Sequence, residues 1–282
     1  MLNTFVTKSF IGFESSYEDS NIVMFGAPFD GTTSFRPGTR FAPNQIRIDS
    51  YGLETYSPYL DLDVEDKCIS DIGDVDIPFG NTKKALDSIK CTCEKIINDG
   101  KKPLLIGGEH LVSLPVIESL YEKYENLHII HFDAHTDLRE DYMGEKLSHA
   151  TVIKRAWDLV GDNKIFQFGI RSGTKTEFEF ACKHTYLNKF DLSNLDFAIK
   201  SIGNNPVYLT IDLDVLDPSI FPGTGTPEAG GITMKEMFSA INSMKSLNFV
   251  GADIVELSPS YDQSGVSTAV ACKVIREISL IL

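Results

Sequence analysis

Short apolar runs alternate with segments of helical periodicity along almost the whole chain. This order of strand, helix and strand predicts a parallel sheet with helices on both of its faces. In several of these runs the residues at both odd and even positions are apolar, as expected for strands that are buried on two faces. The strands are expected at residues 21–26, 103–106, 127–132, 164–168, 207–211 and 249–254. The helices are expected at residues 82–98, 114–124, 151–160, 174–184, 191–202, 233–244 and 267–282.

Length and charge narrow the class of protein further. The 282 residues fit one large α/β domain, since such domains often exceed about 250 residues, and residues 1–282 are expected to form a single domain. The net charge of -14 argues against a nucleic-acid partner, which needs a basic surface, and it suits metal ions and cationic small molecules. No apolar run approaches the roughly 18 residues of a membrane helix. The scattered cysteines are more typical of a reducing compartment, so we expect a cytoplasmic protein without a membrane partner.

Acidic and imidazole side chains follow several of the predicted strands at their carboxyl ends. In open parallel sheets, ligands bind beyond this edge. The sequence therefore predicts six metal ligands there: His110, Asp133, His135, Asp137, Asp212 and Asp214. In an extended chain Asp133 and Asp137 would lie about 13 Å apart, so the backbone must bend at residues 136–137.

The number and type of these side chains predict the metal content. Six ligands exceed the four of a tetrahedral zinc site and suit two divalent ions that share bridging carboxylates. Because oxygen donors predominate, Mn²⁺ is favoured over Zn²⁺. A lone aspartate at a strand end is more often a turn residue, and we assign that role to Asp217, which precedes a proline.

Other candidate residues each have a structural alternative. His131 shares its strand face with Asp133 but is expected to be a core histidine. His149 follows a polar loop and either shuttles protons or simply begins a helix. Glu256 either holds a guanidinium through paired hydrogen bonds or forms a structural ion pair. The basic turn at 36–40 is expected to be structural or to contact another subunit, and not to be catalytic.

These motifs together resemble the ureohydrolase family, which includes the arginases and agmatinases. The similarity runs in order along nearly the whole chain, and the metal motifs are its most specific part. The matching segments are residues 26–30, 36–38, 107–110, 132–137, 211–218, 222–225 and 255–259.

The resemblance implies a three-layer α-β-α sandwich around a mainly parallel sheet, with two Mn²⁺ per subunit. It implies that one ion takes His110 and Asp137, that the other takes His135 and Asp214, and that Asp133 and Asp212 bridge them. Family members commonly form trimers or hexamers, so a homo-oligomer is expected.

The resemblance also implies the reaction and its catalytic residues. A hydroxide that bridges the metals attacks the guanidinium carbon of the substrate, and Asp137 steadies this hydroxide. Glu256 binds the guanidinium, and His149 binds substrate and moves protons at the leaving amine.

The segments around these motifs are most similar to agmatinases, which hydrolyse agmatine to putrescine and urea. Residues 144–151 resemble agmatinases, and the Asn that arginases carry after the metal motif is replaced by Leu138 and Arg139. The acids Glu140, Asp141 and Glu145 are expected to attract a cationic substrate tail. The alternative is another guanidino-substrate hydrolase of the guanidinobutyrase, arginase or formimidoylglutamase type, and a carboxylate-tailed substrate would use Arg139. A one-zinc amide hydrolase and a non-catalytic metal-binding subunit are more distant alternatives.

Overall fold

A nine-stranded sheet forms the middle layer of the computed structural model, which describes residues 4–5 and 8–282. Its strands are β1 (Thr4–Phe5), β2 (Ile22–Ala27), β5 (Ile69–Val75), β6 (Lys102–Gly107), β7 (His128–Phe132), β8 (Ile165–Ile170), β9 (Tyr186–Lys189), β10 (Pro206–Asp212) and β11 (Asn248–Val255). The spatial order is β1-β5-β2-β6-β11-β10-β7-β8-β9, and only the β1–β5 pair in this described sheet is antiparallel. The short strands β3 (Tyr56–Ser57) and β4 (Leu62–Asp63) form a separate pair.

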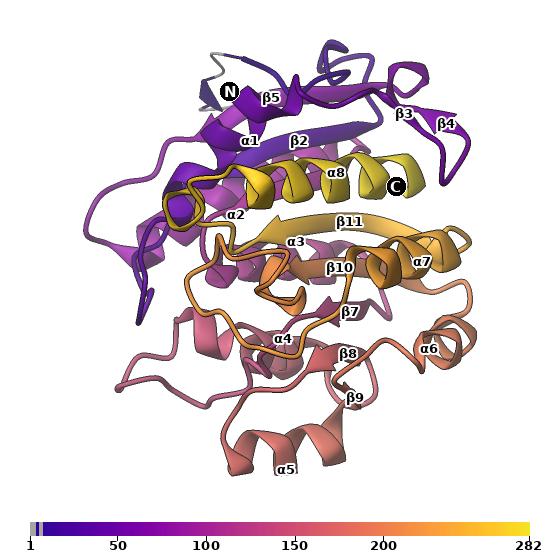
Figure 1. Cartoon of the computed structure of the whole chain (residues 1–282). Coiled ribbons are helices and arrows are strands. Elements are labelled where there is room, and N and C mark those ends of the chain that lie inside the picture. The colour runs from indigo at the N-terminus through magenta and orange to yellow at the C-terminus, as the bar shows by residue number, and fades with distance from the viewer. Residues whose placement is uncertain (1–3, 6–7) are drawn as a thin grey trace.

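Helices cover both faces of this sheet. One buried apolar cluster packs α1 (Ala42–Ser50), α6 (Leu195–Ile202), α7 (Met234–Met244) and α8 (Val266–Ile281) against one face. A second cluster packs α2 (Thr82–Asn98), α3 (Ser113–Lys123), α4 (Val152–Val160) and α5 (Lys175–His184) against the other face. Figure 1 shows α7 and α8 in front of the strands, with α2 and α3 behind them. The predicted three-layer α-β-α sandwich is confirmed.

All the predicted strands and helices are present, with shifts at their ends. The largest shift is in α6, which begins at Leu195 because residues 191–194 form a turn in which Asp191 accepts from the Ser193 backbone. The sequence analysis missed α1, β5, β9 and the short strands β1, β3 and β4. Within the part of the chain that the structure describes, no helix is both long and apolar enough to cross a bilayer.

Four neighbouring strands end at the same edge of the sheet and position the site. β6, β11, β10 and β7 are adjacent in that order. Ile254 of β11 pairs with Ile106 of β6, and Ile211 of β10 pairs with Phe132 of β7, so the strands end nearly in register. The segments that follow them therefore meet, as predicted from the parallel order.

Candidate metal centre and active site

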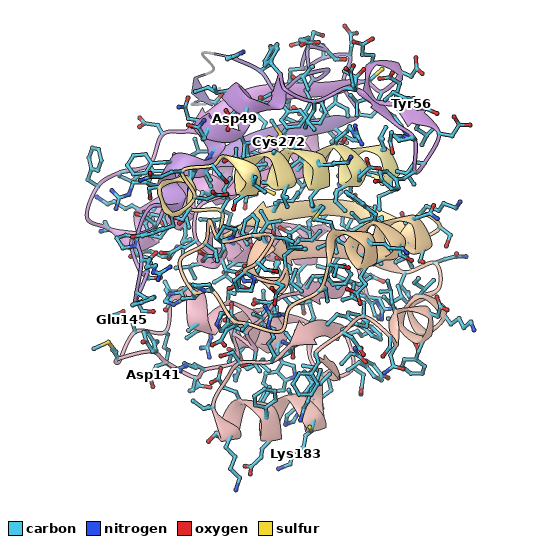
Figure 2. The ribbon with its side chains drawn as sticks, viewed as in Figure 1. Asp49, Tyr56, Asp141, Glu145, Lys183 and Cys272 are labelled. Atoms are coloured by element: carbon cyan, nitrogen blue, oxygen red, sulfur yellow. The ribbon has the colours of Figure 1, made fainter. Side chains whose placement is uncertain are left out.

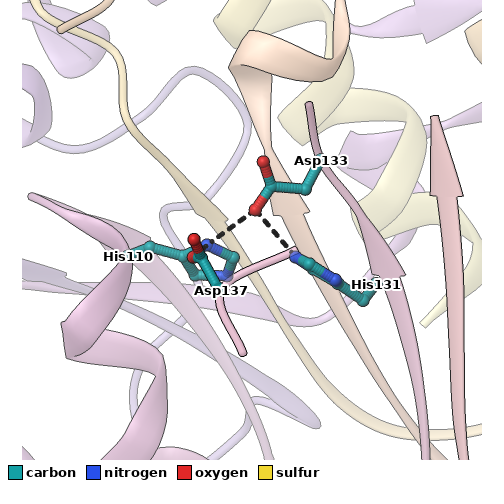
Figure 3. Close-up of side chains that lie close together, drawn as sticks. All are labelled: His110, His131, Asp133 and Asp137. Carbon is teal, nitrogen blue, oxygen red and sulfur yellow. Dashed lines mark hydrogen bonds and ion pairs between the residues drawn. The ribbon is translucent and has the colours of Figure 1, made fainter. Parts of the chain in front are cut away.

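The six predicted ligands lie together at the carboxyl ends of these strands. The Nδ1 atom of His110 lies 3.0 Å from Asp137 Oδ2, 3.2 Å from Asp133 Oδ2 and 3.5 Å from Asp212 Oδ2. Figure 3 shows His110, Asp133 and Asp137 converging in this way, with His131 beside them.

A second group shares Asp133 with the first. His135 Nδ1 lies 3.0 Å from Asp214 Oδ2 and 3.4 Å from Asp133 Oδ1. Asp133 thus presents one carboxylate oxygen to each histidine, which is the arrangement of a carboxylate that bridges two cations. Asp133, His135 and Asp214 are close enough together to hold one ion, as are His110, Asp133 and Asp137.

The backbone bends where the ligand spacing requires it. Asp137 has a φ of 52°, in the left-handed region that side chains rarely adopt. Its carbonyl oxygen accepts hydrogen bonds from the first turn of α4, at 3.1 Å from Ile153 N and 3.0 Å from Lys154 N. Glu256 is also left-handed, with a φ of 65°. Such strained backbone persists where the surrounding structure fixes it and is frequent at functional sites.

His110 has the hydrogen bonding of a metal-binding imidazole. Its Nε2 atom lies 2.9 Å from Thr210 Oγ1, and that hydroxyl donates to Asp253 Oδ1 at 2.7 Å. Its buried Nδ1 atom makes no well-formed hydrogen bond to any residue that the structure describes, although carboxylates surround it. Metal-binding histidines commonly have one nitrogen held by such a partner and the other directed at the ion. The residues present therefore fit a cation at this position.

The electrostatics of the cluster also favour bound cations. Burial, together with the charges of Asp214 and Asp133, raises the pKa of Asp212 well above its usual range. Burial and the nearby charge of Glu109 do the same to the pKa of Glu256. Burial opposes ionisation of Asp133 as well, but the neighbouring imidazoles of His110 and His131 outweigh it and hold its pKa well below the usual range. Buried carboxylates are stable only when they are paired, protonated or bound to a metal.

His131 is a hydrogen-bonded core histidine, as predicted, and its partner is the candidate metal ligand Asp133. Its Nε2 atom lies 2.8 Å from Asp133 Oδ2, and its Nδ1 atom lies 3.1 Å from the Gln167 amide nitrogen. The carboxylate can only accept and the amide NH₂ can only donate, so His131 carries its proton on Nε2. His131 lies two residues before Asp133, so the two side chains share a face, and His131 orients the carboxylate from the end of β7.

A cavity of about 300 Å³ opens onto the metal centre. His149 and Glu256 both line it, as predicted. Glu256 Oε1 accepts from the His110 backbone N–H at 2.7 Å, which ties it to the metal centre. His149 is also the first residue of a short 3-10 helix, as the helix-start alternative predicts, and its role in proton transfer stays a prediction.

The sequence analysis missed Glu177, which lines the cavity beside Arg139. Its carboxylate accepts from Thr136 Oγ1 at 2.7 Å and lies 3.5 Å from Arg139 Nε. It also forms a capping box with Thr174 at the start of α5. The Thr-x-x-Glu spacing predicts that box, but it does not indicate that the carboxylate faces the cavity.

The expectation that Glu140, Asp141 and Glu145 face the substrate is wrong. Glu140 pairs outside the cavity with Lys154 at 3.2 Å and with Arg155 at 3.3 Å. Figure 2 shows Asp141 and Glu145 on an outer loop, and none of these acids lines the cavity. The Asp141 carboxylate accepts instead from the Gly144 backbone N–H at 3.0 Å, within its own loop.

Asp217 is a turn residue, as predicted, and the turn at 36–40 is held by local contacts. Asp217 accepts from the backbone N–H groups of Ser219 and Gly230 at 3.0 and 2.8 Å. In the turn, Arg40 forms an ion pair with Asp30, which also accepts from the Gly38 backbone N–H at 2.8 Å.

Comparison with known proteins decides the family, because the arginase family matches residues 20–281. The chain belongs to the arginase family. An agmatinase of Bacillus subtilis (strain 168) is 48% identical over 277 residues, which cover 97% of this chain and 96% of that protein. A candidate agmatinase from Clostridium difficile has a solved structure that is 56% identical, with a TM-score of 0.93, and the match covers 94% of this chain and 98% of that one.

Other members of the arginase family act on different substrates. A guanidinobutyrase of Pseudomonas aeruginosa is 33% identical over 279 residues, which cover 91% of this chain and 85% of that protein. The family therefore establishes a hydrolase of guanidino compounds, and the substrate has to be argued from the site.

Proposed function

We propose that this chain is an agmatinase, which hydrolyses agmatine to putrescine and urea with two Mn²⁺ per subunit. The observation that carries the proposal is the pair of histidine–carboxylate groups that share Asp133 on the floor of a cavity, with Glu256 beside them. The agmatinase of Bacillus subtilis, similar over almost its full length, supports the choice of substrate.

In this proposal the six ligands divide between two cations. His110 and Asp137 would hold one, His135 and Asp214 would hold the other, and Asp133 and Asp212 would be shared by both. When bound, two divalent cations supply the Lewis acidity that makes a water nucleophilic at neutral pH. The predominance of carboxylate oxygens supports Mn²⁺.

The remaining catalytic groups act on the substrate. Glu256 is buried, and a guanidinium placed beside it restores its ionised form and is held by charge-assisted hydrogen bonds. The Asp137 carboxylate takes one proton of the attacking water and steadies the oxygen that attacks. That proton passes through His149 to the leaving nitrogen as the carbon–nitrogen bond breaks, and the second water proton follows as the urea carbonyl forms. Water and agmatine thus become urea and putrescine, and both residues return to their starting states.

The test is product release from the Mn²⁺-loaded protein with several substrates in parallel. Agmatine, arginine and 4-guanidinobutyrate are assayed for urea, and formimidoylglutamate for formamide. Urea from agmatine at a rate well above the others is the expected result. No product from any of the four, with two metals bound, contradicts the proposal.

Guanidinobutyrase activity is the alternative that a specific observation favours. Arg139 lines the cavity, and a cation there suits a substrate with a carboxylate tail. Urea mainly from 4-guanidinobutyrate in the same assay would select this alternative and leave the metal chemistry unchanged. Metal analysis separates both from a one-zinc amide hydrolase, because we expect two ions per chain.

We also propose a cytoplasmic homo-oligomer, either a trimer or a hexamer. All five cysteines are free thiols, which suits a reducing compartment. Exposed aromatic side chains such as Phe35, Phe41 and Phe79 provide apolar surface for subunit contacts. Light scattering on a sizing column tests the assembly, and a monomeric mass contradicts it. Fractionation of the source cells tests the location.

A further inference from the structure

The loop at residues 28–38 contacts His149 through two hydroxyl groups. Thr32 Oγ1 accepts from the His149 backbone N–H at 3.1 Å and lies 3.5 Å from its Nδ1 atom. Ser34 Oγ lies 3.2 Å from His149 Nε2. The loop therefore holds both the backbone and the ring of the residue that the proposed function assigns to proton transfer.

Glu109 anchors this loop. Its side chain is fully buried, and it lies between Gly108 and the metal ligand His110. The carboxylate accepts from the Thr32 backbone N–H at 2.8 Å, from the Thr32 hydroxyl and from the Thr33 hydroxyl at 3.1 Å. The Glu109 backbone N–H also donates to Phe29 O at 2.8 Å, so the loop is held at two points.

The direction of the hydrogen bonds links these two contacts. A hydroxyl has one proton to donate, and Thr32 donates it to Glu109. Its oxygen can then only accept from His149. The backbone N–H of His149 is one of those at a helix start that lack a partner within the helix, and Thr32 supplies that partner from a distant part of the chain.

We propose that Glu109 and Thr32 are positioning residues that hold His149 for proton transfer, with the Thr32 hydroxyl as the link between them. This inference rests on the proposed function, because it needs His149 to act on the substrate. Glu109 and Thr32 do not touch the reacting atoms, and their effect on the rate passes through His149.

Substitutions at Thr32 test the link with little change in volume. Thr32→Val removes the hydroxyl, and Thr32→Ser keeps it. Thr92→Val is the control: among the residues that the structure describes, the Thr92 hydroxyl bonds only to the Ser88 carbonyl of its own helix. We expect Thr32→Val in the Mn²⁺-loaded enzyme to lower kcat for agmatine by roughly tenfold or more, a fraction of a typical general acid–base contribution. KM, metal content and Tm should stay close to wild type, and Thr32→Ser and Thr92→Val should keep wild-type kcat. A normal kcat for Thr32→Val overturns the inference.

A double-mutant cycle with His149→Ala distinguishes positioning from general support of the loop. If Thr32 acts through His149, Thr32→Val causes no further loss of kcat in the His149→Ala enzyme. Multiplicative losses overturn the inference and leave the proposed function in place. A His149→Ala enzyme with wild-type kcat contradicts instead the proposed role of His149. Glu109→Gln should lower kcat in the same direction, because its NH₂ group would face the donors of Thr32 or Thr33.

Discussion

Arg139 is the residue whose position bears most directly on the choice of substrate. Its side chain is 37% exposed, its guanidinium stacks on the Tyr142 ring at 4.6 Å, and its Nε atom lies 3.5 Å from Glu177. The positive charge is therefore already compensated at the cavity wall, and an amine-tailed substrate does not need it.

Arg139→Ala should therefore leave agmatine hydrolysis within about fivefold of wild type, because a partly exposed ion pair is worth at most about 1 kcal/mol. Steady-state kinetics of urea release measure the effect. Arg155→Ala is the matched control, since Arg155 pairs with Glu140 outside the cavity. Loss of all activity in Arg139→Ala alone would favour a substrate with a carboxylate tail.

Glu256 provides a second prediction on a single residue. Glu256→Gln keeps the size of the side chain and removes its charge. We expect kcat/KM for agmatine to fall by about 10- to 100-fold, the worth of a hydrogen bond to a charged group. The metal content should be unchanged, because the proposed ligands do not include Glu256. Full activity of Glu256→Gln, measured at equal metal loading, would exclude it as the guanidinium-binding residue.

At the scale of elements, the parallel strands were predictable because burial on both faces leaves a continuous apolar run. β5 was not predicted because Asp71 and Asp74 interrupt its apolar pattern. Both pair with the buried Arg47 of α1, whose Nε atom lies 2.7 Å from Asp71. Neither segment alone shows this pairing, so β5 and α1 were missed together.

The candidate site was likewise predictable only in part. The positions of its candidate metal ligands were predictable because short motifs place them at the ends of neighbouring strands. The contacts of Thr32 with Glu109 and of Thr136 with Glu177 join segments that are 77 and 41 residues apart. Such contacts depend on how loops fold over the sheet, and no local pattern encodes them.

The turn after β6 depends on a glycine that has no space for a side chain. A Cβ atom on Gly108 would lie 1.9 Å from the Phe29 carbonyl oxygen. We expect Gly108→Ala to displace the neighbouring Glu109 and His110, to destabilise the fold by about 1–3 kcal/mol as overpacking does, and to weaken metal binding. Urea unfolding and metal analysis measure both effects. Gly52→Ala is the control, because its Cβ atom would meet only Asp49 O, at 3.3 Å. Equal behaviour of the two variants would show that the turn tolerates the change.

At the scale of the whole molecule, the excess of carboxylates makes stability depend on bound cations. The chain carries a net charge of -14, and its centre buries the carboxylates of Asp133, Asp137, Asp212 and Asp214. Cations that bind only the folded chain stabilise it, by about 2.7 kcal/mol at a free concentration 100 times Kd. Removal of metal with a chelator should therefore lower Tm, and addition of Mn²⁺ should restore it.

The same coupling makes metal binding depend on pH. Burial lowers the pKa of His110 and His135, but contacts with Asp133, Asp137 and Asp214 outweigh it and raise the pKa of both well above the usual value. A cation that binds these imidazoles must therefore compete with a proton. Mn²⁺ affinity should rise with pH as these imidazoles lose their protons, with protons released on binding. Titration calorimetry in buffers of different ionisation enthalpy measures both quantities. An affinity that does not change with pH, with no proton release, would mean that these imidazoles are not the ligands.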